Sequence, residues 1–115
     1  LGMTRYWRTE SGLQLDVGPF VKALEFASDR SAKVFGKPAE AFFSQALDLL
    51  GARAEETLMI GDDIRGDVGG AQAAGLKAAL VKTGKFQKSD LSGDIVPDVV
   101  LESFASLPEY WLARH

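Results

Sequence analysis

The sequence has no cysteine, and its single histidine is the last of its 115 residues. The lack of cysteine excludes disulfides, thiolate zinc sites and cysteine nucleophiles. Disorder concentrates at chain termini, so His115 is a poor candidate for a catalytic base. The chemistry that remains is that of carboxylates, lysines and hard metal ions, and it suits a soluble, cytoplasmic protein.

Long apolar runs and clusters of one charge are also missing. No stretch approaches the roughly 20 apolar residues that span a bilayer, and the first residues lack a signal-peptide pattern. The net charge is -3 and no Lys/Arg run stands out, so we expect neither a membrane nor a nucleic-acid partner. Hydrophobic residues make up 46% of the chain, which is enough for the core of one domain or part of one.

From residue 32 onward, short apolar runs alternate with segments of helical periodicity. The predicted elements are a strand at 32–36, a helix at 38–50, a strand at 57–61, a helix at 67–74, strands at 77–81 and 98–103, and a helix at 106–115. Continuous apolar strands separated by helices favour a parallel sheet covered by helices. Before them, the sequence predicts a hairpin at 5–16 and a helix at 18–28.

Three signals mark helix ends. Pro38 stands where first-turn prolines occur, and Gly51 stands where a helix stops. Ser106 and Glu109 have the spacing of a capping box. The helix at 38–50 is the most clearly delimited of the set.

An acidic cluster follows the apolar strand at 57–61. Asp62 and Asp63 stand at its carboxyl end, where open α/β sheets bind ligands, and Gly61 makes a turn easy there. Magnesium takes one or two carboxylates and completes its shell with water and phosphate oxygens, which fits this pair. Alternatively, both aspartates are turn and N-cap residues. Asp67 at the start of the next helix reads as a helix cap.

Lys37 lies directly before the helix at 38–50. A lysine near a helix N-terminus is disfavoured unless an anion lies between the ammonium and the helix. Lys37 is therefore either a lysine that binds phosphate, here called a phosphate clamp, or a solvated surface residue. Only its combination with the acidic cluster favours the clamp. Lys82 and Lys85 are predicted to be surface lysines, because the stretch around Thr83-Gly84 lacks the upstream glycine of a P-loop.

Three stretches, FGKPAEAFF (35–43), MIGDDIRGDVGGAQAAG (59–75) and LVKTGKF (80–86), together resemble the haloacid dehalogenase (HAD) superfamily of phosphatases. The similarity is to the branch whose cap domain is inserted late in the core (type IIA), and it covers nearly the whole chain. It implies an α/β fold with part of a HAD-like Rossmannoid core. Residues 1–18 would be the end of the cap domain and its return to the core, and residues 19–115 the C-terminal half of the core.

The resemblance also implies a role for each candidate residue. Lys37 matches the lysine that neutralises the phosphoryl group and the nucleophile. Asp62 matches a magnesium ligand, and Asp63 a second acidic position that holds the metal or its waters. Asp67 matches an acidic position that orients its neighbours. The implied reaction is Mg²⁺-dependent hydrolysis of a small phosphate ester, phosphoramidate or pyrophosphate through an aspartyl phosphate.

Two motifs of the superfamily are missing from this sequence. One is a strand ending in DxD, which supplies the nucleophile and the general acid, and the other is a strand-end Ser/Thr. Asp16 has no acidic partner two residues on and is not expected to be a nucleophile. We therefore expect a truncated phosphatase that needs the N-terminal half of the same protein and is inactive alone. The missing first strand would leave the strand at 57–61 as an uncovered edge.

Two alternatives remain open. A phosphorelay receiver domain shares this length, an acidic pair and a lysine, although its acidic pair lies near the first strand. A non-catalytic half-domain would instead be a binding or oligomerisation module, with homo-oligomers formed through the uncovered edge. Tyr6 and Trp7 are expected to pack within the hairpin rather than contact substrate.

Overall fold

The computed structural model describes residues 1–114, so His115 lies outside the described residues. The elements are β1 (Tyr6–Thr9), β2 (Gly12–Leu15), α1 (Val17–Ser28), α2 (Glu40–Leu50), β3 (Leu58–Gly61), α3 (Gly70–Ala73), β4 (Lys77–Val81), β5 (Val99–Leu101) and α4 (Leu107–Leu112). A π-helical segment, Ile64–Gly69, leads from β3 into α3. Among these helices, none has the length and apolar content that a membrane span requires.

The centre of the fold is a parallel sheet with the strand order β3-β4-β5. The middle strand, β4, buries Ala78, Ala79 and Leu80 completely, as expected for a parallel strand that is covered on both faces. The predicted α/β fold with a parallel sheet is therefore confirmed. Within the described residues β3 pairs only with β4, so the uncovered edge predicted for the strand at 57–61 is also present.

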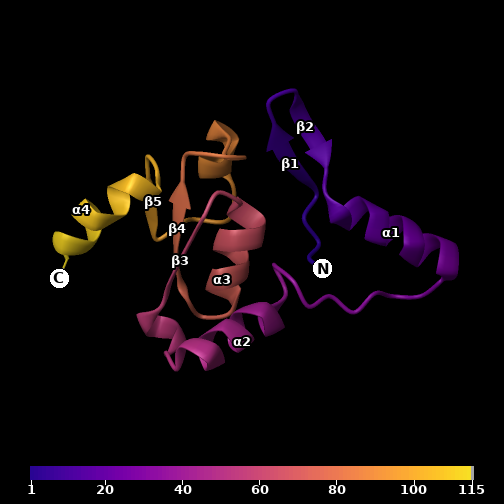
Figure 1. Cartoon of the computed structure of the whole chain (residues 1–115), viewed down its shortest axis with the longest axis horizontal. Coiled ribbons are helices and arrows are strands. Elements are labelled where there is room, and N and C mark those ends of the chain that lie inside the picture. Colours follow the sequence, from indigo (N-terminus) through magenta and orange to yellow (C-terminus); the bar gives the residue numbers. More distant parts are fainter. Residues whose placement is uncertain (115) are drawn as a thin grey trace.

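Successive residues of β4 enter two different core clusters. Ala78 and Leu80 pack in one cluster with side chains from α2, the π-helical segment and α3, namely Phe43, Val68 and Ala71. Ala79 and Val81 pack in the other with Leu101 of β5 and with Leu107 and Tyr110 of α4. The helices thus form layers on both faces of the sheet, with α3 and α4 on opposite sides of β4 (Figure 1).

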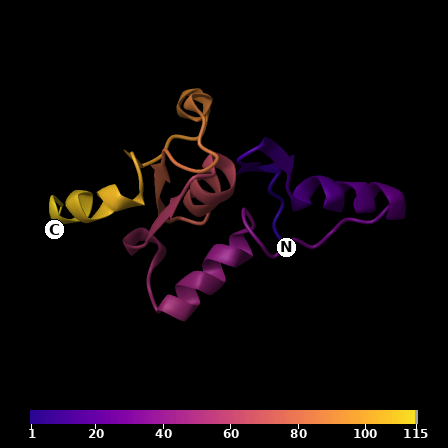
Figure 2. The same cartoon turned by 45° about the horizontal axis from the view of Figure 1, so that its top comes forward.

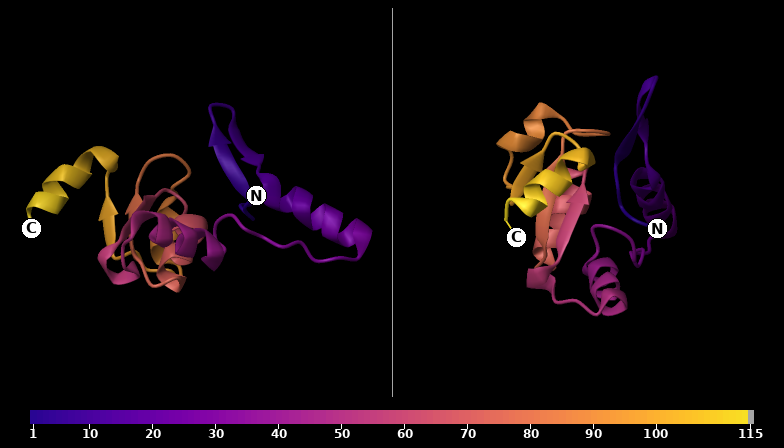
Figure 3. Two further views of the ribbon diagram at one scale, coloured as in Figure 1. Left: turned by 60° about the horizontal axis from the view of Figure 1, so that its bottom comes forward. Right: turned by 60° about the vertical axis from the view of Figure 1, so that its left-hand side comes forward.

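Residues 1–36 form an N-terminal arm beside this core. It contains the antiparallel hairpin of β1 and β2, the helix α1 and an extended segment that returns to Lys37. In Figures 2 and 3 the hairpin stands next to the core while α1 points away from it. The two ends of the arm are joined by hydrogen bonds from Gly36 N to Leu1 O and from Met3 N to Lys37 O, both 3.1 Å.

Three local predictions are wrong. Residues 32–36 form no strand, because no strand among residues 1–114 pairs with them, and the segment connects α1 to Lys37. Pro38 precedes the helix rather than opening it, since Ala39 is the N-cap and α2 begins at Glu40. The capping box at Ser106 does not form. Instead, the Ser103 hydroxyl accepts a hydrogen bond from Ala105 N at 3.2 Å and starts a 3-10 turn before α4.

Candidate functional site

Asp62 and Asp63 leave the end of β3 in different directions. Asp63 is the N-cap of the π-helical segment, where its Oδ1 accepts hydrogen bonds from Arg65 N at 3.0 Å and Gly66 N at 2.9 Å. Asp62 Oδ2 accepts one from Lys85 N at 2.8 Å, in the loop after β4. The N-cap interpretation of Asp63 is therefore confirmed, and it does not exclude a second role for the same carboxylate.

Asp67 is the buried member of the cluster and is only 4% exposed. Its Oδ1 pairs with Lys37 Nζ, and its Oδ2 accepts a hydrogen bond from Asp63 N at 3.2 Å. The prediction of Asp67 as a helix cap is wrong, because Asp63 holds that position. Gly61 is needed for space rather than for a turn, since a Cβ there would lie 2.1 Å from Asp67 Oδ2.

Lys85 was predicted to be a surface lysine, and that prediction is wrong. Its side chain is 15% exposed, and its Nζ lies 2.6 Å from Asp63 Oδ2. The same ammonium donates to Tyr6 O at 3.2 Å and lies 5.2 Å from the centre of the Tyr6 ring. Lys85 thus ties the hairpin of the arm to the acidic cluster. The signal in the sequence was its place at the carboxyl end of β4, where ligands of parallel sheets bind. Lys82 is exposed as predicted and pairs with Glu102.

Asp63 and Asp16, which both line the pocket described next, have lowered pKa values for different reasons. Burial acts to raise the pKa of Asp63, but the hydrogen bond from Lys85, the amides of Gly66 and Arg65 and the charge of Lys85 outweigh it and lower that pKa. Asp16 caps α1, and hydrogen bonds from the Thr4 hydroxyl and Val17 N lower its pKa. Asp16 therefore caps α1, and its expected lack of a nucleophilic role stays a prediction.

The four predicted residues, Lys37, Asp62, Asp63 and Asp67, line one pocket of about 450 Å³, here called the carboxylate pocket. They come from three places in the chain: the end of the arm, the end of β3 and the π-helical segment. The pocket is also lined by six residues for which the sequence predicts no ligand-binding role: Thr4, Trp7, Arg8, Asp16, Gly84 and Lys85. The structure thus brings every candidate residue together at the carboxyl edge of the sheet, as parallel topology requires. Their individual roles stay predictions.

The donor set of the carboxylate pocket fits a hard divalent cation with few protein ligands. No described residue donates a hydrogen bond to the second oxygen of Asp62, whereas both oxygens of Asp63 and Asp67 have partners. Within residues 1–114, no group of three or more Asp, Glu, His or Cys is arranged to hold a metal. Magnesium commonly uses one or two carboxylates and keeps several waters, so Asp62 is the residue best placed to hold it.

Comparison with known proteins shows what the chain is similar to. The HAD-hydrolase-like family matches residues 34–107. Phospholysine phosphohistidine inorganic pyrophosphate phosphatase from Bos taurus is 57% identical over 90 residues, 78% of this chain and 33% of that protein. Among solved structures, p-nitrophenyl phosphatase from Archaeoglobus fulgidus has a TM-score of 0.82 and 30% identity, with 95% of this chain and 44% of that one covered.

A further solved structure contains a metal. Glycerol phosphate phosphatase from Mycobacterium tuberculosis, in complex with magnesium, has a TM-score of 0.77 and 32% identity, covering 92% of this chain and 32% of that one. The chain spans about a third of the length of the curated relatives it matches. These matches confirm the resemblance to late-cap HAD phosphatases and exclude the receiver-domain alternative. The family match extends over more than half of the residues, and the chain therefore belongs to the HAD-like hydrolase family.

Proposed function

We propose that this chain supplies the lysine and the metal-binding carboxylates of a Mg²⁺-dependent phosphatase. The substrates would be small phosphate esters, phosphoramidates or pyrophosphate, hydrolysed through an aspartyl phosphate. The observation that carries this proposal is the ion pair of Lys37 with the buried Asp67, in the pocket that Asp62 also lines. A cation at Asp62 and the ammonium of Lys37 would then flank one space that is open to a ligand.

Each residue of the pocket has a task in this proposal. Lys37 binds an equatorial phosphoryl oxygen, where charge is distributed in phosphoryl transfer, and Asp67 holds its ammonium in place. Asp62 holds Mg²⁺, with Asp63 acting directly or through water, and the bound metal would neutralise phosphate charge. Lys85 fixes Asp63 through their 2.6 Å ion pair and so acts as a positioning residue. These side chains therefore orient and neutralise a phosphoryl group.

The nucleophile of this proposal is an aspartate from a DxD-bearing N-terminal half, and residues 1–115 contain no DxD. That half would place its strand along the uncovered edge of β3, beside Asp62. Residues 1–18 would then be the end of the cap domain, and residues 19–115 the C-terminal half of the core. The partners are accordingly a small phosphorylated substrate and the N-terminal half of the same protein.

The proposal is tested by calorimetric titration of the chain with orthophosphate, with and without Mg²⁺. We expect Mg²⁺ to strengthen phosphate binding, and Lys37→Met to weaken it by about tenfold or more, the effect of losing one charge-assisted hydrogen bond. Lys82→Met is the matched control, because Lys82 pairs with Glu102 and does not line the pocket. Equal losses of phosphate affinity in the two variants, or a phosphate affinity that does not change in Lys37→Met, would contradict the proposal.

The uncovered edge of β3 supports a second candidate, a non-catalytic module that self-associates through this strand. Sedimentation velocity over a range of chain concentrations separates the two. A concentration-dependent dimer combined with no phosphate binding would favour the module. A monomer that binds phosphate through Lys37 would favour the phosphatase.

A further inference from the structure

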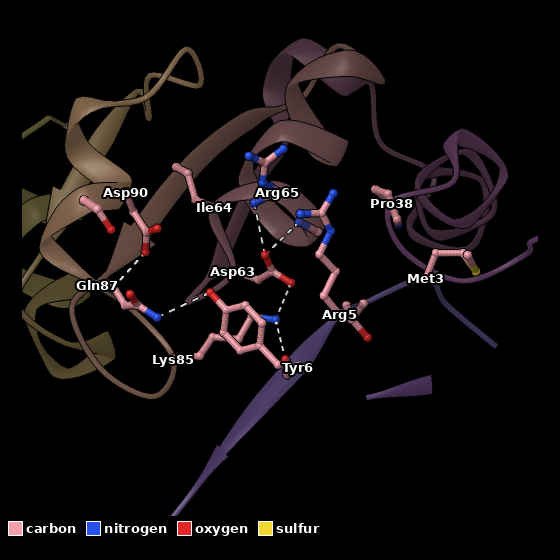
Figure 4. A pocket seen from close by; sticks show the side chains of 13 residues that line it. Met3, Arg5, Tyr6, Pro38, Asp63, Ile64, Arg65, Lys85, Gln87 and Asp90 are labelled. Atoms are coloured by element: carbon pink, nitrogen blue, oxygen red, sulfur yellow. Dashed lines mark hydrogen bonds and ion pairs between the residues drawn. The ribbon is translucent and has the colours of Figure 1, made fainter. Parts of the chain in front are cut away.

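A second pocket adjoins the carboxylate pocket and is rich in cationic side chains. It has a volume of about 500 Å³ and is called here the arginine pocket, after Arg5 and Arg65 (Figure 4). Three residues, Thr4, Asp63 and Lys85, line both pockets. The two pockets therefore adjoin along these shared residues, and an extended ligand with one end beside Lys37 would cross them to reach the arginine pocket.

The two arginines have no carboxylate partner. Within residues 1–114, neither guanidinium forms an ion pair or a hydrogen bond. The carboxylates that line the pocket are already engaged: Asp63 by Lys85 at 2.6 Å, and Asp90 by the Gln87 backbone amide at 2.8 Å. The pocket is thus locally positive in a chain whose net charge is -3. Unpaired guanidinium groups in a concave site favour an anionic ligand, to which the planar guanidinium donates two parallel hydrogen bonds.

The Tyr6 hydroxyl is a neutral hydrogen-bond donor in the same pocket. Gln87 Nε2 donates to the Tyr6 hydroxyl at 3.4 Å, so the hydroxyl acts as acceptor in that contact and its own proton remains available to a ligand. In Figure 4 the side chains of Tyr6 and Gln87 lie below Asp63 in the view, whereas Arg65 lies above Asp63 and Arg5 to its right. Tyr6 was expected to pack only within the hairpin, and here it faces a pocket instead.

We propose that the arginine pocket binds a second anionic group, a carboxylate or phosphonate-like group carried by the leaving-group side of the phosphorylated substrate. Arg5 and Arg65 bind this group, and the Tyr6 hydroxyl adds a hydrogen bond. This inference rests on the proposed function, because it takes the reacting phosphoryl group to bind beside Lys37. It assigns substrate selection to residues of the arm and of the π-helical segment.

The test compares three probes that share one phosphate ester and differ at the far end: n-propyl phosphate, 2-carboxyethyl phosphate and 2-phosphonoethyl phosphate. Their dissociation constants for the chain are measured by calorimetry at fixed Mg²⁺. We expect one or both anionic probes to bind about tenfold more tightly than propyl phosphate, the effect of one charge-assisted contact. Which of the two gains more tells a carboxylate from a phosphonate-like group.

Arg5→Gln and Arg65→Gln should each reduce this preference to below about threefold and leave propyl phosphate binding unchanged. Arg53→Gln is the control, because Arg53 pairs with Glu56 and lines neither pocket. Equal affinity for all three probes, or a preference that survives both substitutions, would overturn the inference. Propyl phosphate binding that is insensitive to Lys37→Met would instead contradict the proposed function, and the lack of any binding would contradict both.

Discussion

The core and the N-terminal arm use apolar residues in opposite ways. In the core, Leu80 of β4 is 0% exposed, whereas in the arm Leu24 and Phe26 of α1 are 70% and 92% exposed. Burial of apolar surface therefore stabilises the core, while α1 rests on its own hydrogen bonds and on the cap provided by Asp16. The carboxylate pocket lies where the core and the N-terminal arm meet, so its geometry depends on the more stable core and on the less stable arm.

The largest expected effect separates the two regions directly. Leu80→Ala should lower the free energy of unfolding by about 2–5 kcal/mol, because it opens a cavity in the core. Leu24→Ala removes the same number of atoms from an exposed position and should change it by less than about 0.5 kcal/mol. Urea titrations followed by circular dichroism measure both. Similar losses in the two variants would show that α1 is buried in solution.

The next effect concerns the ion pair that joins the arm to the core. Lys37→Met leaves the buried Asp67 carboxylate unpaired and should destabilise the chain by about 1–3 kcal/mol, at the lower end of buried pairs because the lysine is partly exposed. Adding Asp67→Asn removes the stranded charge and should recover part of this loss. A double-mutant cycle in urea measures the coupling. Additive losses would mean that the two groups do not interact.

A smaller effect is expected at the start of α1. Asp16→Ala removes the side chain that accepts hydrogen bonds from Val17 N and Thr4 Oγ1, and caps of this kind contribute about 1 kcal/mol. Hydrogen exchange should become faster in α1 and stay unchanged in β4. Leu24→Ala, at a 70% exposed position in the same helix, is the control. Faster exchange throughout the chain would indicate that the arm and core unfold as one unit.

The smallest effect is a pH response that differs between the regions. Hydrogen bonds from Gln72 and Ala78 N lower the pKa of Asp98, an exposed residue directly before β5, below its ordinary value of 3.8. A lowered pKa in the folded state adds stability that is present above pH 3.8 and is lost as the pH falls through the folded-state value. Asp98→Asn should therefore flatten the acid limb of the unfolding free energy. Asp16→Asn should change the dependence of amide hydrogen exchange on acidic pH in α1 only.

The sequence predicted the elements whose structure is decided locally or by a strong apolar pattern. The runs at 57–61 and 77–81 became β3 and β4, and Gly51, with a φ of 61°, ends α2 as expected. The strand predicted at 32–36 does not form, because an apolar run becomes a strand only where a neighbouring strand offers hydrogen bonds. Sequence patterns do not report such a neighbour.

The candidate site was predictable as a set but not in its internal contacts. Parallel topology is enough to bring Asp62 and Lys85 to one edge of the sheet. Which cation pairs with which carboxylate depends on side-chain packing between segments far apart in sequence, such as Tyr6 and Lys85. Because this packing leaves no mark in the sequence pattern, the sequence predicts neither the buried position of Lys85 nor the pocket lined by Arg5 and Arg65.

The most direct test of the central claim maps a phosphate analogue on the chain by amide chemical shifts in NMR. Orthovanadate or orthophosphate, added with Mg²⁺, should shift the amides of Lys37, Gly61–Gly66 and Gly84-Lys85 as one group with a single affinity. The same shifts should vanish in Lys37→Met. Shifts at Lys37 and at Asp62 that follow different affinities, or shifts confined to other parts of the chain, would contradict a shared phosphoryl site at the end of β3.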